Sequence, residues 1–233
     1  MSLSIIIPAR NEDNNILKTV NCLLNVIKNK FKYEIIIIDD FSSDDTYNKI
    51  ISAKKKNVSI YRNKKKGIGG AINLGILKSR MKYLCFVMAD LSDSPKDLIK
   101  YYSIIQNSDF DAIFGSRFIK NSSVKNYPKF KLFLNRCANI FIKILLFSNY
   151  NDFTNAFKIY KKDTINQIKP FNSKSFEIFL EIPLKFIYKK FKYKIIPISW
   201  TDRTKGTSNF KINELSFKYI KTFLGIFLYK FKI

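Results

Sequence analysis

The segment Met88–Asp93 follows an apolar run and carries two carboxylates three residues apart, Asp90 and Asp93. A hard cation that bridges a diphosphate needs only one or two protein carboxylates, because phosphate oxygens and water supply its other ligands. Such a cation stabilises the charge that develops on a departing nucleotide. We therefore expect Asp90 to hold a metal ion and Asp93 to face the same ligand. The alternative is a simple turn, which Ser94 and Pro95 would close.

Polar residues also follow two earlier apolar runs. Asp39 and Asp40 end the second run, where a carboxylate could accept hydrogen bonds from the ribose or base of a nucleotide. Pro8–Glu12 follows the run Leu3–Ile7 in the same way. In both places the alternative is a capped helix start, since acidic residues favour helix N-termini. Two adjacent carboxylates have no evident structural need, so we favour a nucleotide pocket.

Three further segments could bind phosphate. Gly67–Ala71 precedes a helical pattern and permits close approach of a phosphate or sugar to the backbone. Arg117 follows another apolar run and could grip an acceptor phosphate with two hydrogen bonds. Asp202–Ser208 is a polar, cationic loop that could close over a diphosphate. The structural alternatives are a turn, a surface arginine and a solvated loop.

Short β-branched runs alternate with segments of helical periodicity in the first half of the chain. Continuous apolar runs are typical of parallel strands buried on both faces, and apolar residues every three to four positions are typical of helices. The expected strands are Leu3–Ile7, Glu34–Ile38, Val58–Arg62, Tyr83–Met88 and Ala112–Phe114, and the expected helices are Asn15–Lys28, Asp44–Lys54, Gly67–Ser79 and Lys96–Asn107. This alternation predicts an α/β fold with a mostly parallel, doubly wound sheet. Ligands bind at the carboxyl ends of such strands, so the polar segments converge on one cleft.

The second half of the chain has a different pattern. It predicts two basic amphipathic helices, Lys129–Phe147 and Leu215–Ile233, and a strand near Tyr193–Trp200. Basic amphipathic helices dock on anionic membrane surfaces. We expect a main domain over residues 1–211 and a C-terminal amphipathic helix over residues 212–233 that contacts a membrane surface or a partner.

Composition restricts the chemistry. Hydrophobic residues make up 46% of the 233 residues, which is enough for one substantial core. The absence of histidine excludes an imidazole base or ligand, so a metal must sit on oxygen ligands, which favours Mg²⁺ or Mn²⁺. The formal net charge of +24 attracts phosphorylated substrates, anionic lipids or nucleic acid. A compositional bias of the genome would give the same lysine excess without any such partner.

The sequence also carries expectations about location. Its three cysteines are scattered and lack the spacing of a disulfide framework or a zinc site, which fits a reducing compartment. Met1 leads directly into an apolar run without the features of a signal peptide. No apolar stretch approaches the ~20 residues that span a bilayer. We expect a cytoplasmic protein, peripheral on the inner face of the membrane if it binds one.

Taken together, these motifs resemble glycosyltransferase family 2 with a GT-A fold, nearest to the dolichyl- or polyprenyl-phosphate sugar synthases. SIIIPARNE resembles the first strand and nucleotide-binding turn of that family, IIIIDDFSSDDT the second, and VMADLSDSP its D-x-D region. KKKGIGGAINLGI resembles the glycine-rich helix start, and FGSRF, NDFTNAFKIY and WTDRTKGTSNFK the later acceptor and diphosphate loops. The resemblance runs from Leu3 to about Lys211.

The resemblance implies roles for individual residues. The metal falls to Asp90, and the residues at the chemical centre are Asp90, Asp93 and Arg117. The implied substrate-binding residues are Pro8, Arg10, Glu12, Asp40, Gly69, Ala89, Lys131, Asn135, Arg203 and Ser208. Met88 replaces the first carboxylate of D-x-D, so the metal site has one fewer obvious ligand. Lys131 and Asn135 stand where the polyprenyl-phosphate synthases tend to have an arginine and a serine.

Three functions are consistent with these observations. The leading hypothesis is inverting transfer of a sugar from a nucleotide diphosphate sugar to a polyprenyl-phosphate-type lipid, whose phosphate needs no strong base. The second is transfer to a sugar hydroxyl in cell-surface polysaccharide or lipopolysaccharide assembly, with Asp93 as the base. The third is a non-catalytic nucleotide- or nucleic-acid-binding protein. We do not expect nucleic acid as a partner, because the strand-end carboxylates repel phosphates unless a metal intervenes.

Overall fold

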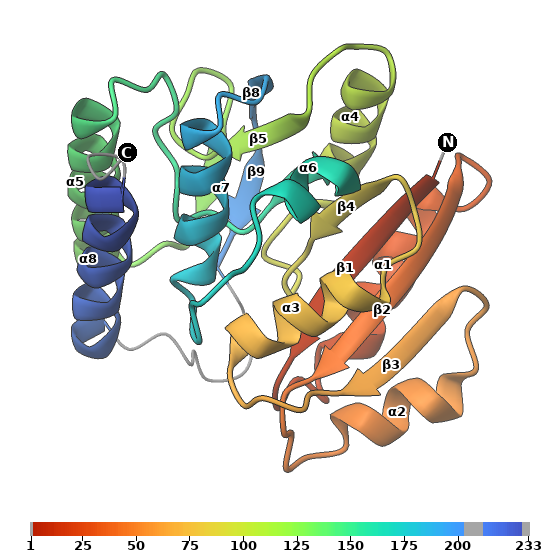
Figure 1. Cartoon of the computed structure of the whole chain (residues 1–233). Helices are drawn as coiled ribbons and strands as arrows, with labels where there is room; N and C mark the ends of the chain where they lie inside the picture. Colours follow the sequence, from red (N-terminus) through yellow and green to blue (C-terminus); the bar gives the residue numbers. More distant parts are fainter. Residues whose placement is uncertain (1, 203–211, 230–233) are drawn as a thin grey trace.

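The computed structural model describes residues 2–202 and 212–229, with side chains of the last helix described over residues 217–228. A central sheet of seven strands, in the order β3-β2-β1-β4-β7-β5-β8, crosses the molecule (Figure 1). Its strands are β1 (Ser2–Ala9), β2 (Lys32–Asp39), β3 (Val58–Arg62), β4 (Tyr83–Phe86), β5 (Ala112–Ser116), β7 (Lys158–Lys161) and β8 (Tyr193–Pro197). All neighbouring pairs are parallel except those of β7, which runs antiparallel to β4 and β5.

The strands of the first half lie where the apolar runs predicted them. Ile5, Ile6 and Ile7 of β1 are fully buried, because helices cover both faces of the sheet. Alternate residues therefore enter two different cores: Ile5 and Ile7 one, and Ile6 the other. This two-sided burial confirms the doubly wound α/β arrangement.

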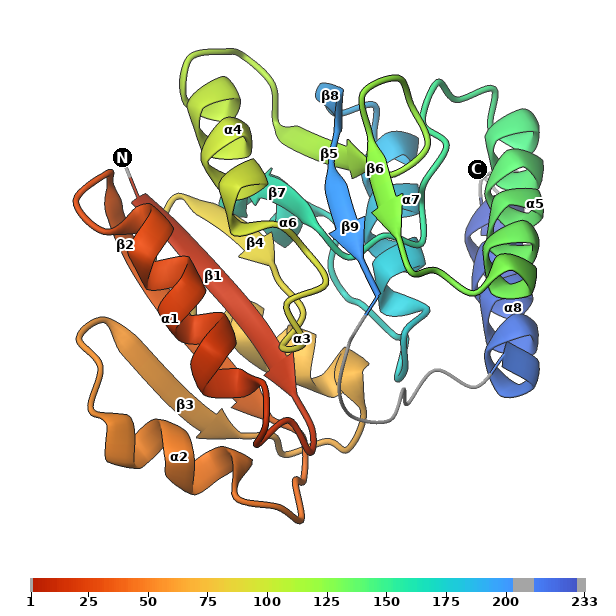
Figure 2. The ribbon, with the colours of Figure 1, turned by 180° about the vertical axis from the view of Figure 1, so that it is seen from behind.

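The helices divide between the two faces. On one face lie α1 (Ile16–Ile27), α2 (Thr46–Ala53) and α4 (Pro95–Gln106). These helices lie in front of the sheet in Figure 2, the view from behind. On the other face lie α3 (Ile68–Lys78), α6 (Lys162–Gln167) and α7 (Ile178–Tyr188). The four helices predicted in the first half of the chain are confirmed to within about two residues at each end, whereas β7, α6 and α7 were not predicted. The helix predicted over Leu215–Ile233 begins earlier, at Ile212.

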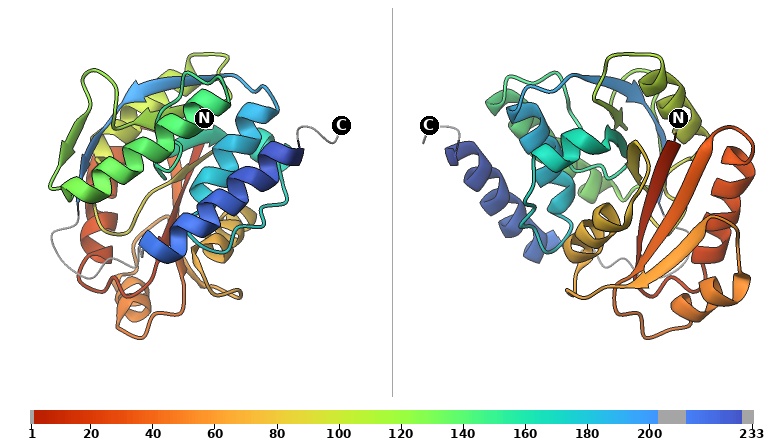
Figure 3. Two further views of the ribbon diagram at one scale, coloured as in Figure 1. Left: turned by 90° about the vertical axis from the view of Figure 1, so that its left-hand side faces the viewer. Right: turned by 45° about the vertical axis from the view of Figure 1, so that its right-hand side comes forward.

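Two long helices flank α7. They are α5 (Lys129–Leu145) and α8 (Ile212–Tyr229), which lie side by side at one end of the molecule (Figure 3, left). The rings of Phe141 and Phe223 lie 6.4 Å apart between them, and α8 packs against α7. None of the described helices is long and apolar enough to cross a membrane. The boundary at residue 211 stays a prediction.

A small parallel sheet closes the edge of the fold. It consists of β6 (Ser123–Lys125) and β9 (Ser199–Thr201). An isolated bridge joins Trp200 of β9 to Asp93, beyond the end of β4. The predicted strand near Tyr193–Trp200 is therefore two strands, β8 and β9, which belong to different sheets.

Candidate active site

A cavity of about 260 Å³ opens at the carboxyl ends of the parallel strands. The predicted site residues that line it are Pro8, Arg10, Glu12, Asp40, Asp90, Asp93, Arg117, Lys131 and Asn135. They lie at the ends of four different strands or belong to α5, so the sheet topology brings together segments that are far apart in the sequence. This convergence is the one expected of a doubly wound sheet.

Asp40 anchors the glycine-rich turn at one side of the cavity. One of its carboxylate oxygens accepts hydrogen bonds from the side chain of Asn63 and from the backbone N–H of Gly67, both at 2.8 Å. Gly67 has a φ of +113°, and a Cβ on it would lie 2.3 Å from the carbonyl oxygen of Lys174. The turn therefore requires glycine, and it presents backbone at the cavity wall.

Two of the predicted substrate-binding residues lie outside the cavity lining. The N–H of Gly69 donates to the carbonyl oxygen of Lys174 at 3.1 Å, and a Cβ on Gly69 would lie 1.9 Å from that of Ser173. Ala89 is buried, and its carbonyl oxygen accepts a hydrogen bond from the hydroxyl of Thr19 at 2.7 Å. Gly69 and Ala89 therefore hold the neighbouring backbone in place and do not face the cavity. The predicted residues 203 and 208, an arginine and a serine, lie outside the described residues.

The turn after β1 is tied to the turn after β2. The N–H of Glu12 donates to the hydroxyl of Thr46 at 2.8 Å, and the carboxylate of Glu12 accepts from the side chain of Asn15 at 2.8 Å. Beside this turn, one carboxylate oxygen of Asp39 is buried and has no hydrogen-bond partner among the described residues. Buried polar atoms usually have partners, so Asp39 joins Asp40 as a candidate contact for a nucleoside.

The two predicted catalytic carboxylates occupy different environments. Asp90 accepts a hydrogen bond from the N–H of Ser92 at 3.0 Å and lines the cavity. Asp93 is 3% exposed, and its carboxylate accepts a long hydrogen bond from the N–H of Met88 at 3.5 Å. Burial, followed by the charge of Asp90, raises the pKa of Asp93 from 3.8 to about 7.

These carboxylates suit a hard divalent cation that takes only one or two of its ligands from the protein. The described residues contain no cluster of three acidic, cysteine or histidine side chains that could enclose a metal. Mg²⁺ and Mn²⁺ are commonly held by one or two carboxylates together with substrate phosphates. Asp90 would supply an oxygen ligand of this kind, and a cation bound there would relieve the repulsion between Asp90 and Asp93. The residues present therefore fit a metal that binds together with a diphosphate.

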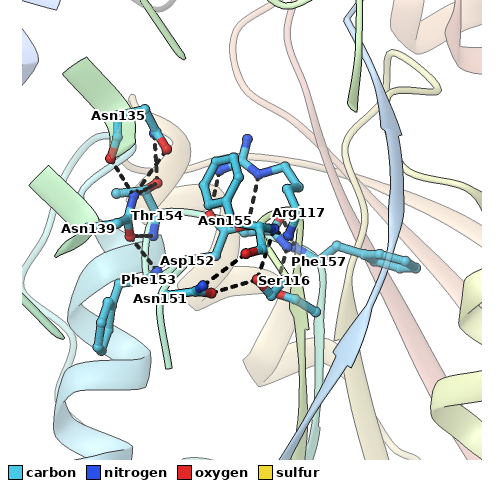
Figure 4. A network of polar contacts seen from close by, with 12 residues as sticks. Ser116, Arg117, Asn135, Asn139, Asn151, Asp152, Phe153, Thr154, Asn155 and Phe157 are labelled. Atoms are coloured by element: carbon cyan, nitrogen blue, oxygen red, sulfur yellow. Dashed lines mark hydrogen bonds and ion pairs between the residues drawn. The ribbon is translucent and has the colours of Figure 1, made fainter. Parts of the chain in front are cut away.

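Arg117 is held by a buried partner that the sequence did not reveal. Its Nε and one terminal nitrogen donate to the two oxygens of Asp152, at 2.9 and 2.7 Å (Figure 4). Its backbone N–H donates to the same carboxylate at 2.9 Å. Burial opposes the charged guanidinium, but the charge and hydrogen bonds of Asp152 outweigh it and raise the pKa of Arg117. The arginine is therefore permanently charged and fixed in orientation.

A second cation faces the same aromatic ring as Arg117. The guanidinium carbon of Arg117 lies 5.7 Å from the ring centre of Tyr127, and the ammonium of Lys131 lies 5.9 Å from it. Trp200 packs on Tyr127 with ring centres 4.7 Å apart. The cavity thus has a cationic, aromatic side built from β5, β9 and α5, beside the carboxylates that follow β4.

The loop 151–157 carries Asp152 and also lines the cavity through Thr154, Asn155 and Ala156. Beneath it, the ammonium of Lys158 donates to the carbonyl oxygens of Phe153 and Asn155. Lys158 is buried, and burial lowers its pKa from 10.5 to about 7.

The last helix also reaches the site. Tyr219 of α8 lines the cavity, and its hydroxyl donates to the carbonyl oxygen of Phe176 at 3.1 Å. The sequence predicted a basic amphipathic helix here but gave no indication that Tyr219 contacts the site. The contact depends on how α8 packs on α7, which no local pattern encodes.

Comparison with known proteins gives a consistent picture. Residues 4–169 match the sequence profile described as Glycosyl transferase family 2. A dolichol-phosphate mannosyltransferase of Pyrococcus furiosus is 28% identical over 225 residues, covering 95% of this chain and 62% of that protein. A polyprenol monophosphomannose synthase of Mycolicibacterium smegmatis is 26% identical, covering 92% of this chain and 84% of that protein. The chain thus spans less than two thirds of the Pyrococcus protein.

A solved structure shows the same fold. Glucosyl-3-phosphoglycerate synthase from Mycobacterium tuberculosis, in complex with Mn²⁺, UDP and phosphoglyceric acid, matches with a TM-score of 0.76. The match covers 97% of this chain and 78% of that one at 14% identity. The likeness confirms the expected GT-A type of fold.

Proposed function

Because the chain belongs to glycosyl transferase family 2, we propose that it transfers a sugar from a nucleotide diphosphate sugar to a polyprenyl phosphate. The observation that carries this proposal is the pair of cations, Arg117 and Lys131, that line the cavity and both contact the ring of Tyr127. A phosphate monoester is the acceptor that such a pair binds best. The likeness to synthases of lipid-phosphate sugars supports the same acceptor.

The donor would occupy the opposite part of the cavity. Asp40 and Glu12 line this part, where they offer acceptors to the ribose and base. A divalent cation, when bound by Asp90 together with the diphosphate, would neutralise charge on the leaving nucleotide. The fold relative crystallised with Mn²⁺ and UDP supports this use of a metal.

The reaction needs little acid–base chemistry from the protein. An oxygen of the acceptor phosphate attacks the anomeric carbon, the bond from that carbon to the diphosphate breaks, and the nucleoside diphosphate leaves with the electron pair. A single displacement of this kind inverts the anomeric centre. Arg117 and Lys131 orient the attacking phosphate, which is already anionic at neutral pH.

The acceptor's lipid tail requires the cavity to lie near a membrane, and α5 provides the connection. This helix contributes Lys131 and Asn135 to the cavity, yet it turns an exposed apolar face to solvent. The exposed apolar residues of α5 and the adjacent α8 are Phe130, Phe133, Leu134, Ile140, Phe141, Ile144, Phe217, Ile220, Leu224 and Leu228. We propose that this face inserts into the headgroup region of a bilayer, helped by the net charge of +24. The unpaired cysteines support a reducing compartment, and we propose that the bilayer surface is the cytoplasmic one.

The direct test is transfer of radiolabel from a panel of nucleotide sugars into polyprenyl phosphate in vesicles with Mn²⁺. We expect organic-soluble product with one donor, and loss of product when Arg117 is replaced by methionine. Nucleotide binding without transfer from any common donor would overturn the proposed acceptor.

A sugar hydroxyl is the alternative acceptor, and one observation favours it. Asp93 lines the cavity with a pKa near 7, which suits a general base. Replacing Asp93 by Asn separates the two: transfer to a hydroxyl would fall by a factor of about 10² or more, while transfer to a phosphate would fall much less.

A further inference from the structure

Helix α5 turns its polar side inward, and one residue at its centre is almost fully buried. Asn139 is 1% exposed, although it is an amide in a surface helix. Buried amides are retained only where their hydrogen bonds are satisfied. Apart from Asn135 on the same helix, the partners of Asn139 lie in the loop 151–157, which also carries the partner of Arg117 (Figure 4).

The amide of Asn139 uses both of its ends. Its oxygen accepts hydrogen bonds from the backbone N–H groups of Phe153 at 2.6 Å and Thr154 at 3.4 Å. Its nitrogen donates to the hydroxyl of Thr154 at 3.2 Å, and to the backbone and side-chain oxygens of Asn135 at 2.9 and 3.0 Å. Asn135 in turn donates to the same hydroxyl at 3.0 Å. An isosteric leucine would satisfy none of these groups, and an aspartate would satisfy only the two backbone N–H groups.

These contacts join the two halves of the cationic side of the cavity. One half is Arg117, oriented by Asp152 of the loop. The other half is α5, which carries Lys131 and Asn135. Asn139 bonds to the residue that follows Asp152 and to Asn135, so it fixes the position of the loop relative to the helix.

We propose that Asn139 is a positioning residue, which sets the spacing between Arg117 and Lys131 and so matches the two cations to one phosphate group. It touches neither the cavity nor a substrate, and it acts through Asp152 and the loop. The matching of the two cations to a phosphate rests on the proposed phosphate acceptor. The fixed position of the loop relative to α5 does not depend on that acceptor. The outer face of α5 is the proposed membrane contact. The hydrogen bonds of Asn139 therefore connect the helix that contacts the membrane to the loop that orients Arg117.

The test compares Asn139→Leu with Asn73→Leu. Asn73 is a matched control, because its amide donates to the carbonyl oxygens of Gly69 and Phe171, on α3 and beside it rather than on α5. For Asn139→Leu we expect the KM for polyprenyl phosphate to rise roughly ten- to a hundredfold, the effect of a small misplacement of binding groups. The KM for the nucleotide sugar, and its slow hydrolysis without acceptor, should change less than about twofold. A merely structural role would lower hydrolysis and transfer together, and that result would overturn the proposal.

A second readout does not depend on the reaction. In protein labelled with ¹⁵N-arginine, the Nε–H of Arg117 should give a slowly exchanging signal in the wild type and in Asn73→Leu. It should exchange faster in Asn139→Leu, whereas Asn139→Asp, which keeps the acceptor for Phe153 and Thr154, should retain most of the protection. An unchanged signal in Asn139→Leu would overturn the inference. Absence of lipid transfer in the wild type would instead overturn the proposed acceptor and leave this measurement decisive for Asn139.

Discussion

Asp152 and Arg117 form a buried ion pair in which the carboxylate accepts from the side chain and the backbone of the same arginine. The side chains are 0% and 7% exposed. A buried pair adds little stability compared with apolar residues of similar size, but removal of one partner leaves an uncompensated charge. This pair therefore keeps a charge in place at the cavity wall.

Replacing Asp152 by Asn should lower the free energy of unfolding by about 3–5 kcal/mol, because the guanidinium loses its counter-charge in a buried place. The double variant Arg117→Met with Asp152→Leu should recover much of that stability while transfer stays absent. Urea denaturation with a transfer assay checks both. Equal stability of wild type and Asp152→Asn would show that solvent, and not Asp152, compensates Arg117.

Replacing Met88 by Asp should strengthen metal binding, since it adds a second oxygen ligand beside Asp90 at the cavity. The Mn²⁺ concentration that gives half-maximal binding of a nucleoside diphosphate should fall several-fold, and Asp90→Asn should abolish the metal dependence. Met81→Asp, in the turn before β4, controls for added negative charge. Calorimetric titration of the nucleotide at several Mn²⁺ concentrations measures the effect. No difference between the Met88 and Met81 variants would place the metal elsewhere.

Replacing Phe133 and Ile144 by serine should weaken binding to anionic vesicles. The two side chains are 62% and 64% exposed on α5, and burial of each large apolar side chain in the bilayer contributes about 1.5–3 kcal/mol. The double variant should therefore lose at least about a hundredfold in vesicle affinity. Leu77→Ser, on α3 and 72% exposed, should bind vesicles as the wild type does. Equal losses for both surfaces in a flotation assay would contradict a specific membrane face.

Lys158 should make the free energy of unfolding depend on pH above about pH 7. Burial lowers its pKa in the folded state from 10.5 to about 7, so between these values the unfolded chain binds more protons than the folded one. Stability from this group therefore rises as the pH increases from about 7 toward 10.5, and below pH 7 its unfavourable contribution is constant. The unfolding free energy of the wild type should therefore rise relative to that of Lys158→Met as the pH increases from 7 to 9. A difference that is flat over that range would mean that Lys158 stays charged.

The sequence was sufficient for the parallel half of the sheet, because strands buried on both faces must be continuously apolar. Leu3–Ile7 and Glu34–Ile38 could hardly be anything else, and the carboxylates after them had to meet at one edge. Helix α7 was not predicted, because its sequence lacks a clear pattern. It is apolar on nearly every side and contains Pro183, so it has neither the polar face nor the uninterrupted pattern of a typical helix.

The site was less predictable than the fold wherever a partner is distant in sequence. Arg117 was identified as a phosphate ligand, but Asp152, which orients it, lies 35 residues away and has no local signature. Asn139 lies in a segment that the sequence predicted only as a basic amphipathic helix. Only the packing of α5 shows that its polar side faces inward. Pairings of this type depend on tertiary structure, and periodicity contains no information about them.

Tyr219 gives the order of chain synthesis a functional meaning. The strands β1, β2 and β4 and the carboxylates that follow them lie within residues 2–93, whereas α8 begins at Ile212, yet α8 supplies part of the cavity wall. The carboxylate side of the cavity is therefore synthesised early, and the cavity wall is completed only by the last described helix. A chain that ends before α8 would lack Tyr219 and so leave the cavity open at this wall.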